Sequence, residues 1–444
     1  MTAASTRAVR RQVINLAWPI VLSNVLQRGV GFVDTMLVGH LGTPELAGVG
    51  IAQIIIFIAM AALYATGVGA TVVVAYHTGA NEPERQREVA NSSLLAGAVL
   101  AVLLAFVGHW IMAPIVRWIG AEGAALDACL EYLTIVWWFF IFKGLIQVAS
   151  SIFQGAGDTR TPLIVVTGVN IIHILIAYPL VFGRWGMPQL GVAGSAIAAG
   201  CSEMLGALVL MRWAHWRSLI SRKIAWYRRA DLTRLWRIGL PVAGERFSIQ
   251  LMQGVFSHMV IGFSVAAFAA HQIGIYIESV SFLPGLGFMQ AATALMGQSL
   301  GRGDLEMARR QSRESNRLAL ILMTALGLSY YFFPHFWVSL FSSDPEVLAY
   351  GKTFCKIAAF IQPPLAMTLV YSGSLRGAGE TRWVLYISMI GSWVVRIPFA
   401  WLTAFHFGGG LLWVWIAMPL DWFVRSVLVY LRFRFGPLEP QKIR

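Results

Sequence analysis

The chain has 444 residues, of which 57% are hydrophobic and only 12% are charged. A soluble domain carries about 25% charged residues, so this composition excludes a chain whose whole surface faces water. The net charge of +13 could suggest a nucleic-acid-binding protein, but the basic residues concentrate in particular connecting segments, which indicates membrane topology instead.

Apolar segments long enough to cross a bilayer recur along the whole chain. A helix of about 20 mostly apolar residues spans the hydrocarbon core. The first such segment is longer than the apolar region of a typical signal peptide, so we interpret it as a membrane helix. The sequence predicts twelve membrane helices, at 13–38, 46–75, 90–113, 128–152, 160–182, 190–213, 235–261, 267–299, 317–341, 350–374, 383–405 and 410–431.

The distribution of Lys and Arg predicts the orientation of these helices. One side of the membrane receives the arginines before the first helix, the basic stretch 215–239 and those between 302 and 317. The other side receives essentially Arg117 and Arg184. Since cytoplasmic loops carry the excess of basic residues, we expect both termini in the cytoplasm and a multi-pass protein of the inner membrane. The stretch 215–239 is basic and partly amphipathic, which is typical of a segment lying on the membrane surface.

An internal repeat with a period of 222 residues divides the chain into two halves. Each half holds six predicted helices, an even number, so both halves cross the membrane in the same direction. We therefore expect an all-α integral membrane fold of two pseudo-symmetric six-helix bundles: an N-lobe at 1–214, a cytoplasmic linker at 215–234 and a C-lobe at 235–444. The matching positions include Pro19 and Pro241, Thr71 and Thr293, Gly79 and Gly301, Arg87 and Arg309, and GAGDTR from Gly155 with GAGETR from Gly377.

Three motifs carry a resemblance to a known family. The run GFVDTMLVGHLGTPELAGVGIA (31–52), the stretch 269–304 and the paired loops QGAGDTR and RGAGETR resemble the multidrug and toxic compound extrusion (MATE) transporters. The match covers essentially the whole chain and favours the DinF-like members over NorM. The resemblance implies a V-shaped pair of lobes that rock around a central cleft. It also implies export of organic cations, amphipathic drugs or metabolites in exchange for inward protons or sodium ions, and no enzymatic activity.

Asp34 is the leading candidate for ion coupling. A charge at the bilayer centre costs about 3 kcal/mol or more, so it needs a partner or a function. Pro19 lies upstream and can kink the same helix, as Pro241 can in the second half. Asp34 falls on the aspartate of the first MATE helix that is implicated in coupling, and it could bind a proton or a sodium ion. The alternative is a solvated or salt-bridged carboxylate near the outer helix end.

Other polar residues of the first half could complete a cluster around Asp34. We expect Asn24, Gln27, Asn170, His173 and Glu203 to take part, although a hydrogen-bonded packing network is an open alternative. The pattern departs from DinF-like members, which place an Asn and an Asp before the proline of the fifth helix. This chain has Ile174 and Tyr178 before Pro179, so the second acid is missing and the coupling ion is left open.

The second half offers candidates for substrate binding. The NorM pattern requires an acid on the tenth helix, but 360–373 has none, so we expect no second cation site of that type. Asp421 and Arg425 are four residues apart on one helix and are predicted to pair. The sequence assigns no partners to Arg28, Lys143 and Arg396. The candidates for substrate contact are Glu245, Gln250, Glu278, Gln53 and Met289.

Several rival functions lack their motifs. The chain has no P-loop, no GxSxG or HExxH motif, and three scattered cysteines without metal-ligand spacing. We expect no cofactor beyond the coupling ion, no nucleic-acid partner, and a monomer that contacts the lipid bilayer and a small-molecule substrate. A flippase for lipid-linked precursors, an intramembrane enzyme and a non-transporting scaffold are the alternatives.

Overall fold

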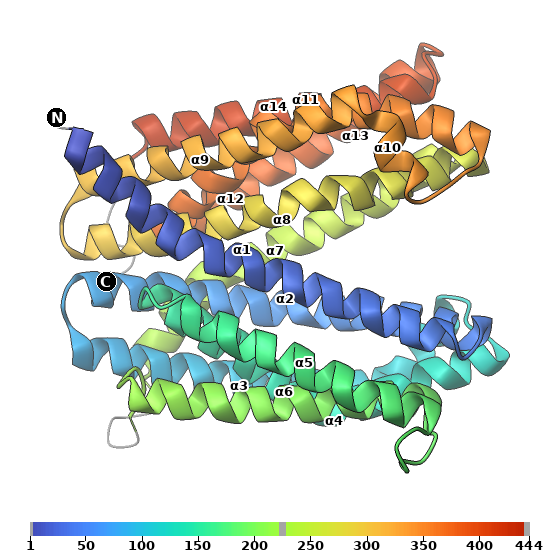
Figure 1. Ribbon diagram of the computed structural model, residues 1–444. Helices are drawn as coiled ribbons and strands as arrows, with labels where there is room; N and C mark the ends of the chain where they lie inside the picture. Colours follow the sequence, from blue (N-terminus) through green and yellow to red (C-terminus); the bar gives the residue numbers. More distant parts are fainter. Residues whose placement is uncertain (1–2, 222–227, 439–444) are drawn as a thin grey trace. The chain divides into compact units, whose positions relative to one another are not determined.

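The computed structural model describes residues 3–221 and 228–438, and every regular element within these ranges is helical (Figure 1). The elements of the first half are α1 (Ala3–Gly39), α2 (Thr43–Gly79), α3 (Pro83–Trp118), α4 (Gly123–Gly155), α5 (Arg160–Phe182) and α6 (Gly191–Trp216). Those of the second half are α7 (Arg229–Ile261), α8 (Val265–Gly301), α9 (Leu305–Phe332), α10 (Pro334–Ser339), α11 (Pro345–Gly377), α12 (Thr381–Met389), α13 (Ile397–Trp401) and α14 (Leu411–Phe435). Two π-helical segments, η1 (Ile390–Arg396) and η2 (Leu402–His406), continue α12 and α13.

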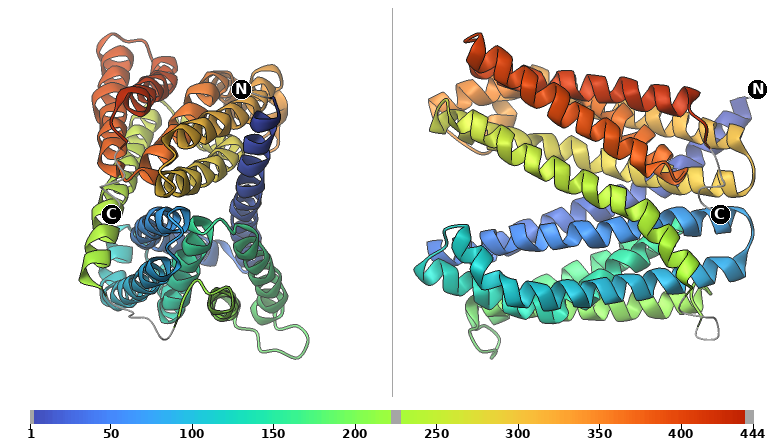
Figure 2. Two further views of the ribbon diagram at one scale, coloured as in Figure 1. Left: turned by 90° about the vertical axis from the view of Figure 1, so that its left-hand side faces the viewer. Right: turned by 180° about the vertical axis from the view of Figure 1, so that it is seen from behind.

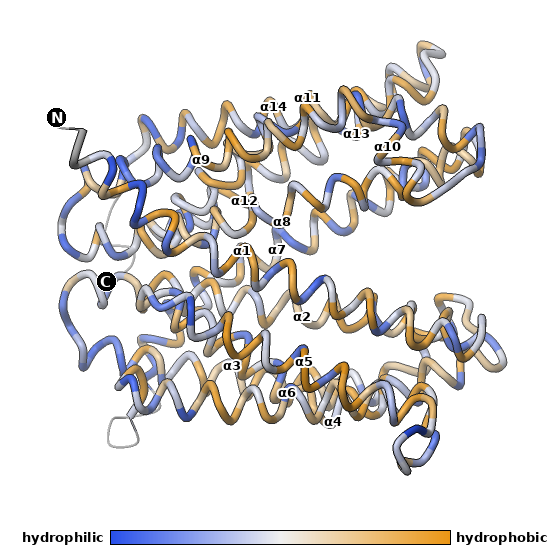
Figure 3. Tube along the Cα trace, in the orientation of Figure 1, coloured by the Kyte–Doolittle hydropathy of each residue, from blue (hydrophilic) through white to orange (hydrophobic). Residues whose placement is uncertain are grey.

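The helices are long and apolar enough for a multi-pass membrane protein. Among the described residues, ten spans meet both the length and the hydropathy expected of a membrane helix. The two other predicted spans correspond to α7 and α9, which have 33 and 28 residues but more polar surfaces. A 37-residue helix such as α2 is about 55 Å long, more than the hydrocarbon core requires. Hydrophobic residues accordingly dominate the middle stretches of the helices, and hydrophilic residues gather in the connections (Figure 3).

One predicted span is displaced. The sequence predicts a helix at 317–341, whereas α9 begins at Leu305 and ends at Phe332. The side chain of Asp304 accepts a hydrogen bond from the backbone of Met307, which caps the earlier start. Pro334 lacks a backbone N–H and begins the short helix α10 instead.

The chain forms two compact units, each a bundle of lengthwise helices (Figure 2). The N-terminal unit comprises Leu22–Leu240, and the C-terminal unit comprises Met1–Val21 together with Pro241–Arg444. These units differ from the expected halves because α1 and α7 each contribute to both. The borders lie beside Pro19 and Pro241, the positions expected to kink these helices. Of the expected linker 215–234, residues 222–227 lie outside the described residues, and α7 already begins at Arg229.

The N-terminal parts of α1 and α7 explain this division. Val13 and Ile20 of α1 belong to the hydrophobic core that α8, α9 and α11 form in the C-terminal unit. Arg10 also donates to Glu314 of α9 at 2.6 Å. On α7, the fully buried Asp231 accepts from Arg85 of α3 in the N-terminal unit, at 3.1 Å.

The internal repeat recurs as matching local geometry. Thr71 donates a hydrogen bond to the carbonyl oxygen of Ser151 at 3.0 Å, and Thr293 donates to that of Gly373 at the same distance. Both residues of the second bond lie 222 positions after those of the first. Both units therefore have the same contact between their second and fourth long helices, α2 with α4 and α8 with α11, which agrees with the repeat.

Candidate functional site

A buried polar cluster surrounds Asp34 within the N-terminal unit. Asp34 is 5% exposed, so its carboxylate is not in bulk water. Ser195 donates to Oδ1 at 2.5 Å, and the Tyr132 hydroxyl donates to Oδ2 at 3.4 Å. His173 Nε2 lies 3.4 Å from Oδ1. Three different side chains therefore converge on one carboxylate, each from a different helix.

The helices of this unit position the cluster. Asp34 comes from α1, Tyr132 from α4, His173 from α5 and Ser195 from α6. Gln53 of α2 supports the arrangement because its Nε2 donates to the Tyr132 hydroxyl at 3.2 Å. Donors that face a carboxylate favour its charged form, and a proton that binds there must disrupt these bonds. The charge of Asp34 is therefore linked to its contacts with α4, α5 and α6.

The structure brings only part of the predicted coupling set together. His173 lies beside Asp34, as predicted. Glu203 instead pairs with Lys143 at 2.5 Å, and Gln27 is exposed. The side-chain amide nitrogens of Asn24 and Asn170 are buried without a hydrogen-bond partner among the described residues.

Sequence reasoning missed Tyr132 and Ser195. Both lie in helices that were predicted, but neither residue type is unusual inside a membrane helix. The only signal was general, because a tyrosine that is buried in an apolar helix usually needs a partner for its hydroxyl. Only the packing of α4 and α6 against α1 selects these two among similar residues.

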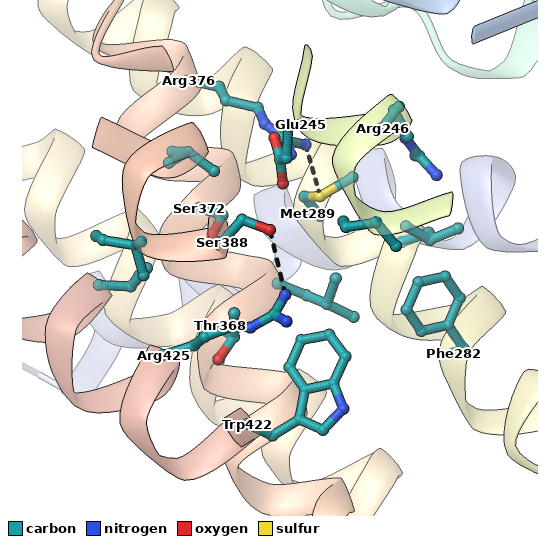
Figure 4. Close-up of a pocket in the computed structure, with 16 residues that line it drawn as sticks. Glu245, Arg246, Phe282, Met289, Thr368, Ser372, Arg376, Ser388, Trp422 and Arg425 are labelled. Carbon is teal, nitrogen blue, oxygen red and sulfur yellow. Dashed lines mark hydrogen bonds and ion pairs between the residues drawn. The ribbon is translucent and has the colours of Figure 1, made fainter. Parts of the chain in front are cut away.

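A pocket lies inside the C-terminal unit (Figure 4). About 530 Å³ of space free of protein atoms lies within the pocket and at its mouth, part of it open to the outside. Its lining comes from α7, α8, α11, α12 and α14. The lining residues are Glu245, Arg246, Ile249, Phe282, Leu286, Met289, Thr368, Leu369, Ser372, Arg376, Val384, Ile387, Ser388, Trp422, Arg425 and Val429.

The pocket includes two of the predicted substrate contacts. Glu245 and Met289 both line it, but Glu245 accepts from Arg376 at 2.7 Å. Arg376 also reaches the sulfur of Met289, at 3.1 Å (Figure 4). The charge of Glu245 is therefore already balanced by an arginine.

The other predicted substrate contacts lie elsewhere. Gln250 is exposed on α7, and Gln53 belongs to the cluster around Asp34 in the other unit. Glu278 is half-buried on α8, close enough to Arg396 for an electrostatic interaction. None of these three residues lines the pocket.

A second ionic network lies beside the pocket. The predicted pair of Asp421 and Arg425 is confirmed by two hydrogen bonds, at 2.5 and 2.8 Å. Asp421 also lies 2.8 Å from Nε of Arg396, on the π-helical segment η1. The partners of Arg396 and Lys143 are thereby assigned, whereas Arg28 is exposed on α1.

Comparisons with known proteins decide the family. The model of the family described as MatE matches residues 19–179 and 241–402, the same two segments that the internal repeat relates. The chain belongs to the MatE family. This membership makes it a multi-pass membrane transport protein and agrees with the expected resemblance.

MATE proteins with related sequences include several that are named NorM. The chain is 31% identical to the "Probable multidrug resistance protein NorM" of Thermotoga maritima, over 98% of this chain and 94% of that one. It is 25% identical to the "Uncharacterized transporter YisQ" of Bacillus subtilis, over 95% and 93% of the two chains. The NorM name of the first relative does not support the expected closer likeness to DinF-like members.

Solved MATE structures share the fold. A MATE crystal structure with a proline-to-alanine substitution aligns with a TM-score of 0.90 at 20% identity, covering 96% of this chain and 95% of that one. The Vibrio cholerae MATE transporter VcmN with an aspartate-to-asparagine substitution also gives a TM-score of 0.90, at 19% identity and 97% coverage of both chains. At this identity the likeness establishes the fold alone.

Proposed function

We propose that this MATE protein is a secondary antiporter that exports amphipathic small molecules, organic cations and drugs among them, in exchange for inward protons bound at Asp34. The buried carboxylate with its Ser195, Tyr132 and His173 neighbours supports this function most directly. The names of relatives as multidrug resistance proteins support export of drug-like compounds. The distribution of basic residues supports an inner-membrane location with both termini in the cytoplasm.

The surroundings of Asp34 favour a proton over a sodium ion. Hard cations prefer several oxygen ligands, whereas the group nearest to Asp34 besides the two hydroxyls is an imidazole nitrogen. Carboxylate and imidazole are both proton-binding groups, so the pair of Asp34 and His173 suits a proton as the coupling ion.

Proton binding gives a physical basis for coupling. The ionised carboxylate holds α4, α5 and α6 through donors, and protonation removes the charge that these donors stabilise. Bonds to a charged acceptor contribute about 1.5–3 kcal/mol each, so their weakening can shift an equilibrium between two conformations substantially. We propose that this shift is what links inward proton movement to export.

Transport by the purified protein in liposomes tests the proposal. Ethidium and 8-anilino-1-naphthalenesulfonate serve as a cationic and an anionic amphipathic dye, under an imposed pH gradient or an imposed sodium gradient. We expect the pH gradient alone to drive at least one dye. Asp34→Asn should reduce the rate by at least about tenfold, to the level of empty liposomes.

Asp127→Asn is the matched control, because Asp127 is an exposed acid on α4 of the same unit. It should retain the wild-type rate. Transport driven equally well by sodium at constant pH would refute proton coupling, and full activity in Asp34→Asn would remove Asp34 from the mechanism.

A further inference from the structure

The charges around the C-terminal pocket are unequal. Three arginines line it, Arg246, Arg376 and Arg425, against the single acid Glu245. Arg376 and Arg425 are almost fully buried, at 5% and 3% exposure. Buried cations inside a membrane protein are costly and usually face a partner, a cavity or a ligand.

The neighbouring acids do not reverse this excess. Asp421 is shared between Arg425 and Arg396, so one carboxylate serves two guanidinium groups. Adding Glu278, which faces Arg396, gives four arginines and three acids in this part of the unit. Counted against both Glu245 and Asp421, the three arginines of the lining still leave one positive charge in excess.

The rest of the wall is apolar and aromatic. Phe282 and Leu286 of α8 lie on one side and Leu369 of α11 on another. Trp422 stacks under the Arg425 guanidinium, 4.8 Å from its ring centre. In Figure 4, Glu245 and Arg376 occupy one end of the pocket, and Arg425 with Trp422 the other. Such a wall suits a ligand with an apolar body and a charged end.

From these observations we infer that the C-terminal pocket binds an amphipathic anion, whose carboxylate, sulfonate or phosphate group meets the arginines while its apolar body lies on the aromatic wall. The planar guanidinium group donates paired hydrogen bonds that match the oxygens of such anions. A cationic ligand would instead have to displace Arg376 from Glu245, the acid in the pocket lining. The inference deepens the proposed function by naming a substrate class, and binding tests it separately from transport.

Binding of two probes with the same apolar body tests the charge preference. The probes are 1-naphthalenesulfonate and 1-naphthylmethylammonium, measured by calorimetry on the purified protein in a non-ionic detergent. We expect the anion to bind at least about tenfold more tightly than the cation. Equal affinities, or tighter binding of the cation, would overturn the inference.

Two variants change the pocket charge in opposite directions. Arg246→Gln leaves the Glu245–Arg376 pair intact and should weaken binding of the anion about tenfold. Glu245→Gln removes the only acid of the lining and should strengthen it, whereas a cation site would lose affinity for the ammonium probe. Arg302→Gln is the matched control, since Arg302 is exposed after α8 and should leave both affinities unchanged. An unchanged sulfonate affinity in Arg246→Gln would overturn the inference even if Glu245→Gln fails to fold.

The anion could be a soluble compound or a lipid headgroup, and a second arm separates them. The sulfonate is titrated into protein held in phosphatidylcholine nanodiscs with and without phosphatidylglycerol. Anionic lipid also repels the sulfonate from the bilayer surface, and the variant Arg246→Gln measures this general effect. If phosphatidylglycerol weakens sulfonate binding more in the wild type than in Arg246→Gln, the pocket binds a lipid headgroup. If it weakens binding equally in both proteins, the pocket binds a soluble amphipathic anion. Loss of any preference for the sulfonate in both bilayers would refute anion binding.

Discussion

Asp421→Asn is expected to destabilise the C-terminal unit strongly. Asp421 is fully buried and lies within 2.8 Å of both Arg396 and Arg425. A charge pair at about 4 Å between charge centres is worth about 4 kcal/mol at an effective dielectric constant of about 20. Removing one partner of a buried pair typically costs about 3–5 kcal/mol, because the other charge is left uncompensated.

The loss of unfolding free energy in Asp421→Asn should be near the middle of the range of about 3–5 kcal/mol. Two arginines lose their shared acid, which increases the loss, but Glu278 still faces Arg396 and reduces it. At about 2–4 °C per kcal/mol for a unit of this size, the midpoint of thermal unfolding should fall by about 10 °C. The midpoint can be measured in detergent by size-exclusion chromatography after heating.

A charge-balanced double variant tests the reasoning. Asp421→Asn combined with Arg396→Met removes one acid and one base, so it should recover part of the lost stability. Asp344→Asn, at the exposed cap before α11, is the reference for a change that only weakens a helix start. A single variant within about 1 kcal/mol of the wild type, or a double variant less stable than the single one, would refute the electrostatic explanation.

Three smaller predictions concern glycine packing, the repeat and the Asp34 cluster. Gly391→Ala should cost about 1–3 kcal/mol, seen as a lower unfolding midpoint, because an added Cβ would meet the carboxylate and guanidinium of α14. Thr71→Val and Thr293→Val should each cost about 1 kcal/mol, since each removes the equivalent buried hydrogen bond between helices, although the Thr293 hydroxyl also reaches the Met289 carbonyl. A measurable cost at one position and none at the other would contradict the structural repeat. Ser195→Ala should slow proton-driven transport several-fold by removing a donor to Asp34, whereas Ser202→Ala, whose hydroxyl donates to carbonyls of its own helix α6, should not.

The helices and the repeat could be predicted because their signals are local. Runs of about 20 apolar residues identify membrane helices without reference to the rest of the chain. The spacing of 222 residues likewise needs only the sequence, and it matched Thr71 with Thr293, two positions that make equivalent hydrogen bonds in the structure. The span at 317–341 was misplaced because the first turns of α9 are polar. Hydropathy therefore did not indicate that the helix begins at Leu305.

Partner choice, in contrast, depends on which helices pack together. Asp421 and Arg425 could be paired in advance because they lie one turn apart on one helix. The partners of Asp34, Glu203 and Glu245 come from other helices, 60 to 161 residues away along the chain.

The amino-acid sequence by itself therefore determined the membrane class and the twofold repeat, because these follow from composition and spacing. Only the tertiary structure decided that Asp34 faces Ser195, Tyr132 and His173, and that arginines prevail around the C-terminal pocket. The physical reason is that a buried charge is stabilised by whatever group packing brings within a few ångströms, and sequence spacing does not encode that distance across helices.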